Sequence, residues 1–248
     1  MLKMSNVLVT CCNSAYYESC LLLISTVHST SDSTIDRILV YNLGLSGEQV
    51  DLLNRCHKVQ VVEFPAWLSD IYPEFLTPKQ YAWKTFVIKD AASYGDNIFY
   101  LDSGAMLVRD IKDIYEKIEQ NHIFVVGDSH KNRTWTHDLC FRIMGASEEE
   151  KNANQICAGI QGYKPNGRFQ RYVDEGFLYA CIKSAIFGDH KNHRHDQSIY
   201  SVLVKRYGIE HEDIDIYGEW KGILRPNQAI YVHRRYFPVS KIHLKMKG

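Results

Sequence analysis

The feature that most constrains the fold is an alternation of short apolar runs with segments that carry apolar residues at helical spacing. The apolar runs have the continuous hydrophobic pattern of strands that are buried on both faces of a parallel sheet. In chain order, the expected strands are residues 7–10, 37–41, 59–64 and 97–101. The alternation predicts an α/β fold in which helices flank a mixed, mostly parallel sheet.

Two capping boxes predict where helices of the first half begin. Ser46 and Gln49 have the spacing in which each side chain bonds the backbone of the other residue. Thr77 and Gln80 repeat that spacing, with Pro78 at the first helical position. We therefore expect helices that start after Ser46 and after Thr77.

The second half is less regular, and no obvious linker interrupts it, so we expect a single domain over residues 1–248. Its expected elements are a helix over 111–120, a strand over 122–126, a loop over 128–138, a strand over 156–163, a helix over 169–187, a histidine-rich segment over 189–196, a helix ending at 207 and a strand over 230–233.

Composition excludes some classes of function. Lys+Arg and Asp+Glu are both 29, and this balance argues against a protein that mainly binds nucleic acid. The seven cysteines have no metal-like spacing and predict reduced, buried thiols in a cytoplasmic protein. The most apolar stretch, residues 20–27, is too short for a transmembrane segment. No Gly-x-Gly-x-x-Gly follows the first strand, which disfavours a nicotinamide enzyme.

The strongest chemical signal is Asp102 at the end of an apolar strand, followed by the small residues Ser103 and Gly104. Ligands of open α/β sheets bind at the carboxyl ends of the strands. A carboxylate at that place can hold a divalent cation that clamps a diphosphate, or it can simply cap the next turn.

Several motifs, taken in order, resemble those of GT-A glycosyltransferases, particularly family 8, which includes glycogenin and bacterial lipopolysaccharide galactosyltransferases. The resemblance covers most of the chain. The matching segments are the first strand and the apolar helix after it, the second strand and its turn, Lys84 in the helix before the acidic motif, Tyr100-Leu101-Asp102, Ala158-Gly159, Asp196-Gln197 and His243.

The resemblance implies transfer of a sugar from a nucleotide diphosphate donor, with a uridine donor expected, to a hydroxyl of a glycan or other acceptor. It places donor-binding residues at Thr10, Asn13, Lys84, Asp102, Ser103, Gly104, Ala158 and Gly159. The sugar would contact Asp196 and Gln197, and a base for an inverting reaction would be Asp196 or Asp138. A retaining reaction, as in family 8, requires no such base.

The resemblance also implies Mn²⁺ or Mg²⁺ held by Asp102 and His243. Gly104 replaces the second aspartate of the Asp-x-Asp motif, and Cys157 replaces an asparagine. Either one cation is still bound, or basic side chains stabilise the diphosphate instead. The candidates for that second role are Lys84, Arg109, Arg234 and Arg235. The loss of the aspartate leaves open an inactive nucleotide-sugar or carbohydrate-binding module.

Two further groups allow two interpretations each. His190, His193 and His195 lie among polar residues, which favours a solvated loop over a zinc cluster. Trp67 and Trp135 lie in expected loops, where their rings either stack on a sugar or anchor the loop.

Overall fold

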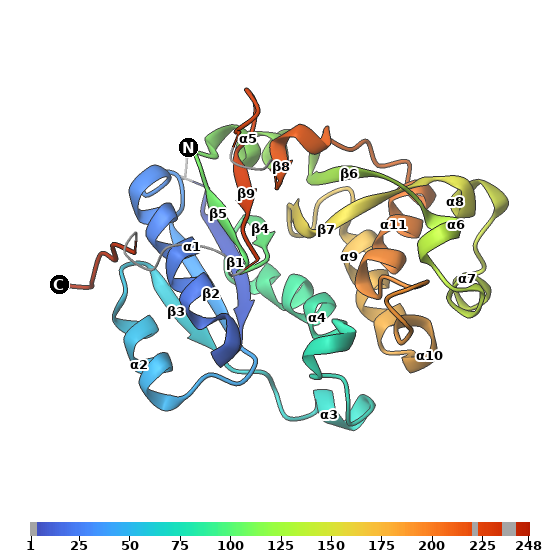
Figure 1. Cartoon of the computed structure of the whole chain (residues 1–248), viewed down its shortest axis with the longest axis horizontal. Helices are drawn as coiled ribbons and strands as arrows, with labels where there is room; N and C mark the ends of the chain where they lie inside the picture. The colour runs from blue at the N-terminus through green and yellow to red at the C-terminus, as the bar shows by residue number, and fades with distance from the viewer. Residues whose placement is uncertain (1–3, 220–222, 235–241) are drawn as a thin grey trace.

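The computed structural model describes residues 4–219, 223–234 and 242–248. Its main sheet has six strands in the order β3-β2-β1-β4-β7-β6 (Figure 1). The pairs β1–β2, β1–β4 and β2–β3 are parallel, whereas β7 runs antiparallel to both β4 and β6. The expected mixed α/β architecture is therefore confirmed.

The elements of the first half follow the expected alternation. They are β1 (Asn6–Cys12), α1 (Tyr17–Thr30), β2 (Arg37–Asn42), α2 (Gly47–Arg55), β3 (Val59–Val62), α3 (Leu68–Ile71), α4 (Ala82–Asp90), β4 (Asn97–Leu101) and β5 (Ala105–Leu107).

The second half continues with helices and the two antiparallel strands. Its elements are α5 (Lys112–Asn121), β6 (Ile123–Lys131), α6 (Asn132–Trp135), α7 (Asp138–Met144), α8 (Glu148–Asn152), β7 (Asn154–Tyr163), α9 (Gln170–Ala180), α10 (Lys183–Ile186), α11 (Asp196–Arg206), β8 (Tyr217–Gly218) and β9 (Ile230–Val232). A second, three-stranded sheet has the order β5-β9-β8.

The main sheet is buried on both faces. One apolar cluster joins its strands to α4, α9 and α11, and the other joins them to α1, α2 and α5. All five residues of β4 are buried, as the continuous apolar run of that strand predicts. Among the described helices, none is long and apolar enough to cross a membrane. All seven cysteines carry free thiols.

The two capping boxes have different outcomes. Ser46 and Gln49 form the reciprocal bonds that begin α2, as expected. Thr77 makes no capping bond, and the predicted helix start there is wrong. Pro78–Gln80 form only a 3-10 turn, because Tyr81 adopts a left-handed backbone with φ of 57° and interrupts the helix. The continuous helix begins one residue later, at Ala82.

Two other expectations are corrected in the second half. The loop expected over 128–138 is mostly ordered structure, since β6 continues to Lys131 and α6 follows it directly. The helix expected over 169–187 is divided into α9 and α10. In contrast, the late strand at Ile230 forms as predicted and pairs with β5 and β8.

Candidate functional site

The carboxyl ends of β1 and β4 open into a cleft of about 540 Å³. These two strands are neighbours at the point where the strand order changes direction, which is where open α/β sheets bind ligands. The lining residues come from the ends of β1 and β2, the segment before α4, the turn after β4 and the second sheet. They are Cys11, Cys12, Asn13, Tyr16, Leu43, Pro78, Lys79, Tyr81, Trp83, Asp102, Ser103, Gly104, Ala105, Tyr217, Val232 and Arg234.

Asp102 links the cleft to the buried charges of Lys84 and Asp196, neither of which lines the cleft. The Lys84 ammonium, on α4, lies 2.9 Å from Oδ1 of Asp102 and 3.5 Å from Oδ2 of Asp196. The Tyr100 hydroxyl donates a hydrogen bond of 2.7 Å to the same Oδ1 of Asp102. Lys84 and Asp196 are both buried, whereas the Asp102 side chain is 40% exposed and reaches the cleft. One ammonium therefore joins two carboxylates from different elements.

Burial and pairing act in opposite directions on these groups. Burial alone would lower the pKa of Lys84, but the Asp102 and Asp196 carboxylates outweigh it, so this pKa lies above its ordinary value. Burial raises the pKa of Asp196 to about 6, although Lys84 opposes the change. Burial also raises the pKa of the Tyr100 hydroxyl, with Asp102 adding to the effect. The hydroxyl therefore stays a hydrogen-bond donor to Asp102 at neutral pH.

The start of α11 places Asp196 at the network. Asp196 is the first residue of that helix, and its neighbour His195 has the strained backbone angles φ 53° and ψ −120°. Such angles persist only where the surrounding structure imposes them, and they are concentrated at functional sites. Gln197 donates a hydrogen bond of 2.9 Å to the side chain of Gln155 on β7. The Asp-Gln pair is thus held by the buried surroundings of α11.

Aromatic rings surround the Lys84 ammonium. Its Nζ lies 5.2 Å from the ring centre of Tyr81, 5.9 Å from that of Trp83 and 5.4 Å from that of Tyr100. The left-handed backbone of Tyr81 brings its ring to this position. Trp83 lines the cleft, and its indole nitrogen is buried without a hydrogen-bond partner among the described residues. The cleft thus combines charged groups with flat apolar surfaces.

The structure brings most of the expected donor residues to this region. Asn13, Ser103 and Gly104 line the cleft beside Asp102. Thr10 and Ala158 are fully buried behind it and do not line it.

Gly159 supports Asp102 from β7. Its carbonyl accepts a hydrogen bond of 2.9 Å from the Asp102 backbone N–H. A Cβ added at Gly159 would lie 2.6 Å from both Oδ2 of Asp102 and the Tyr217 hydroxyl. Glycine at this position therefore leaves room for the Asp102 carboxylate.

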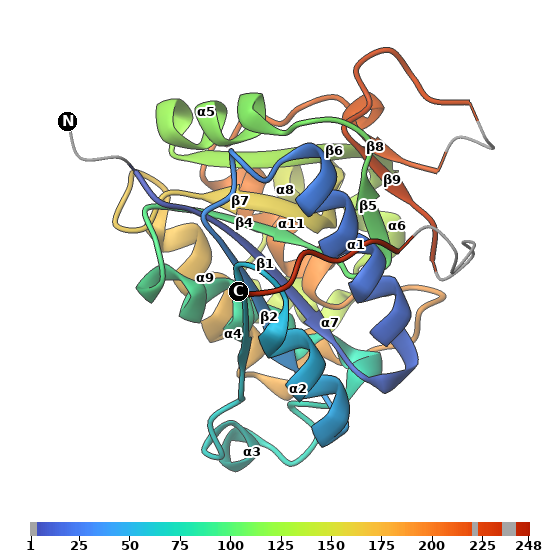
Figure 2. The ribbon, with the colours of Figure 1, turned by 90° about the vertical axis from the view of Figure 1, so that its left-hand side faces the viewer.

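The residues expected to hold a divalent cation are not brought together. His243 is exposed and does not line the cleft, and its backbone N–H donates a hydrogen bond to the Ser25 hydroxyl on α1. The C-terminal segment passes over this helix (Figure 2). Asp102 is the one carboxylate among the described lining residues. Gly104, which stands where the motif has its second aspartate, has no side chain that could bind a metal. Within the described residues, no three acidic, histidine or cysteine side chains are grouped so that they could hold a metal.

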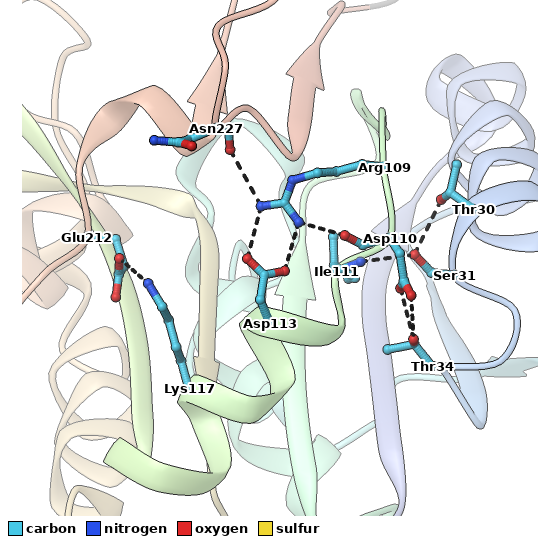
Figure 3. Close-up of polar contacts among 10 residues, drawn as sticks. All are labelled: Thr30, Ser31, Thr34, Arg109, Asp110, Ile111, Asp113, Lys117, Glu212 and Asn227. Atoms are coloured by element: carbon cyan, nitrogen blue, oxygen red, sulfur yellow. Dashed lines mark hydrogen bonds and ion pairs between the residues drawn. The ribbon is translucent and has the colours of Figure 1, made fainter.

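Other expected residues lie elsewhere. Asp138 is exposed in the first turn of α7 and does not line the cleft. Arg109 forms an ion pair of 2.8 Å with Asp113 at the start of α5, also outside the cleft (Figure 3). Arg234 is exposed and lines the cleft, whereas Arg235 lies outside the described residues.

The histidine-rich segment differs from the solvated loop that its polar neighbours predict. His193 and His195 are buried, and His193 stacks on His137 with ring centres 3.9 Å apart. His190 remains exposed, and its Nδ1 lies 3.3 Å from Nε2 of His195. Burial lowers the pKa of His193 to about 3 and also lowers that of His195. His193 and His195 therefore pack in the interior as neutral rings.

The two loop tryptophans pack against protein side chains. Trp67 contacts the rings of Phe86 and Phe177, and the Arg194 guanidinium lies 4.2 Å from the ring centre of Trp135. The structure therefore gives both rings an anchoring role. Neither ring lines the cleft.

Sequence reasoning missed several lining residues. The Thr77–Gln80 spacing predicts that Lys79 lies in the first turn of a long helix, whereas it lies in the 3-10 turn that precedes Tyr81. Tyr217 comes from a two-residue strand that has no sequence pattern of its own. The Tyr100 hydroxyl bonds Asp102 without lining the cleft, and the apolar pattern of its strand predicts only burial. A tyrosine two residues before Asp102, on the same face of the strand, was the one available signal.

Comparison with known proteins supports the fold. No family model matches the chain, and no curated protein matches its sequence. Among solved structures, the chain is similar to the bifunctional glycosyltransferase WbbM, with a TM-score of 0.58 and 14% identity over 88% of this chain and 40% of that one. The chain thus spans less than half the length of WbbM.

Two further structures match over larger shares of their length. The galactosyltransferase LgtC, in complex with donor and acceptor sugar analogues, matches with a TM-score of 0.60 and 10% identity over 92% of this chain and 86% of that one. Core-mannan synthase A of Aspergillus fumigatus, in a Mn/GDP form, matches with a TM-score of 0.58 and 9% identity over 86% of this chain and 73% of that one. The chain has the GT-A glycosyltransferase fold.

Proposed function

We propose that this protein transfers a sugar from a nucleotide diphosphate donor, with a uridine diphosphate sugar as the first candidate, to a hydroxyl of a glycan or other acceptor. The observation that carries the proposal is the buried Lys84 between Asp196 and Asp102, the carboxylate that lines the cleft. Buried ion pairs contribute little net stability because of their desolvation cost. We therefore attribute this one to function.

The cleft has the groups that this chemistry needs. The bond between the anomeric carbon and the diphosphate breaks, and negative charge develops on the leaving diphosphate. Lys79 and Arg234 line the cleft and are exposed, so their charges can stabilise that group. Asp102 reaches the cleft as a hydrogen-bond acceptor for sugar hydroxyls. The rings of Tyr81 and Trp83 offer apolar surfaces for a base or a sugar.

The positions of the carboxylates bear on the mechanism. Asp196 faces Lys84 and is only 3% exposed, and Asp138 lies outside the cleft. Their placement does not support either residue as the base that an inverting reaction requires. The retaining reaction that family 8 implies requires no base from these residues. Analysis of the anomeric configuration of the product would decide between the two reactions.

The similar structures support a nucleotide diphosphate donor. All three are named as sugar-transferring or mannan-synthesising proteins, and one was solved with GDP. A second candidate function is an inactive module that binds nucleotide sugars or carbohydrates. Gly104 favours this alternative, since it removes a carboxylate from the site.

The test is a calorimetric titration with UDP- and GDP-sugars, on wild type, Asp102→Asn and Asp51→Asn. Asp51 is exposed on α2 and serves as the matched control. We expect one donor to bind wild type and the control alike, and to bind Asp102→Asn about tenfold more weakly or worse, because a charge-assisted hydrogen bond is lost. If no donor binds, the proposed function is wrong.

A second measurement separates transferase from module. Release of nucleoside diphosphate from the bound donor is followed with and without a panel of hydroxyl acceptors. If the wild type releases nucleoside diphosphate and the Asp102→Asn variant releases it more slowly, the result supports sugar transfer. Donor binding with no release under any condition supports the inactive module instead.

A further inference from the structure

Lys84 joins two carboxylates of this site. Its ammonium lies between Oδ1 of Asp102 and Oδ2 of Asp196, at 2.9 Å and 3.5 Å. The two aspartates come from β4 and α11, so the fold brings them together around this one charge. Carboxylates converge in this way on bound cations, but here the cation is a side chain of α4.

The remaining ligand positions around Asp102 do not suit a divalent ion. Its Oδ1 already accepts hydrogen bonds from both Lys84 and Tyr100. Mg²⁺ and Ca²⁺ require six or more oxygen ligands, supplied by carboxylates, waters and phosphates. Gly104 offers no carboxylate, and within the described residues no three acidic, histidine or cysteine side chains are grouped at Asp102. Among the described residues that line the cleft, only Asp102 offers a carboxylate to a divalent ion, and one of its two oxygens is already bonded. The neighbouring ammonium would also repel the ion.

The cleft holds other positive charges that could bind a diphosphate. Lys79 lies in the turn before Tyr81, and Arg234 follows β9. The Arg234 backbone N–H donates a hydrogen bond of 3.1 Å to the Gly104 carbonyl, which fixes this residue beside the turn after β4. Both side chains are exposed, and neither forms an ion pair with a described carboxylate. They supply charge where a divalent ion would otherwise be needed.

We propose that the Lys84 ammonium takes the place of a divalent cation at this site, and that Lys79 and Arg234 hold the donor diphosphate. The first part follows from the geometry of Lys84, Asp102 and Asp196. The second part rests on the proposed function. Donor binding is then independent of divalent metal, although the sequence motifs resemble those of enzymes that use one.

The first part is tested by electron paramagnetic resonance of Mn²⁺, with and without UDP or GDP. We expect wild type to leave the signal of free Mn²⁺ unchanged. Gly104→Asp adds a second carboxylate, and its Cβ would meet only ordinary contacts, the nearest at 3.7 Å. We expect this variant to bind Mn²⁺ at least about tenfold more tightly than wild type. Gly47→Asp, on exposed α2 with no atom within 4 Å of its Cβ, is the charge-matched control.

The second part is tested by calorimetry of UDP, GDP and their sugars in EDTA and in Mn²⁺. We expect equal affinity in the two buffers. We also expect Lys79→Met and Arg234→Met each to weaken binding about tenfold, whereas Lys89→Met, whose exposed lysine pairs with Asp174, leaves it unchanged.

The outcomes separate the two parts of the proposal. A single tight Mn²⁺ site in wild type that is lost in Asp102→Asn would overturn the role of Lys84. Binding that EDTA abolishes and Mn²⁺ restores would overturn the metal-independent donor site. If no nucleotide binds in either buffer, the proposed function and the diphosphate role of Lys79 and Arg234 both fail. The manganese result for Lys84 would still hold or fail on its own.

Discussion

Replacing Asp196 with asparagine should change how the stability of this protein depends on pH. Asp196 is buried, and its pKa in the folded protein is about 6, compared with an ordinary value of 3.8. Between these two values the folded state binds the proton and the unfolded state does not. The contribution of this proton to the free energy of unfolding is therefore fully present below pH 4, and it is lost as the pH rises to about 6.

The magnitude follows from the two pKa values. At about 1.4 kcal/mol per pH unit, the ionisation of Asp196 removes about 3 kcal/mol of stability between pH 4 and pH 7. Asparagine has nearly the same shape and cannot ionise, so Asp196→Asn does not lose this contribution. The free energy of unfolding of the variant, relative to wild type, should thus rise by about 3 kcal/mol over this range.

The assay is urea unfolding at pH 4, 5, 6 and 7, followed by circular dichroism. Asp138→Asn removes an exposed carboxylate of the same type and controls for the change in net charge. The difference between Asp196→Asn and wild type reports mainly on this group, because the other titrating side chains are the same in both proteins. A difference that stays constant from pH 4 to pH 7 would refute the view of Asp196 as a buried, ionising carboxyl.

Two further predictions concern the packing around the site. Gly159→Ala places a methyl group 2.6 Å from both Oδ2 of Asp102 and the Tyr217 hydroxyl, and should cost about 1–3 kcal/mol in urea unfolding, whereas Gly47→Ala should be neutral. His193→Phe removes a buried imidazole whose pKa is lowered to about 3, so wild type loses stability below pH 6.5 and the variant does not. Relative to wild type, this variant should gain about 2 kcal/mol between pH 7 and pH 5, and no gain would contradict the burial of a neutral ring.

Much of the fold could be predicted from local patterns. The strands β1, β2 and β4 are continuous apolar runs, and such runs are stable only between two covered faces. The same patterns placed Asp102 at the carboxyl end of a buried strand, and therefore at the edge where the cleft lies. The Ser46 cap depends only on Ser46 and Gln49, so the sequence alone predicts this helix start.

The failures have a common physical cause. Thr77 and Pro78 satisfy the local rules for a helix start, but Tyr81 takes a left-handed backbone that places its ring between His195 and Lys84. The histidine-rich segment is polar in sequence, but packing against His137 buries two of its rings. In both cases contacts from distant parts of the chain outweigh local preference.

The sequence by itself determined the α/β class, the order of the strands along the chain and the carboxylate that ends β4. Those properties depend on hydrophobic periodicity, which is local. Only the tertiary structure decided that Lys84 lies between Asp102 and Asp196, and that no third metal-ligating side chain of the described residues joins them. Lys84 precedes Asp196 by more than a hundred residues, and no local sequence pattern predicts a contact over that separation. The folding of α4 and α11 onto one face of the sheet creates it.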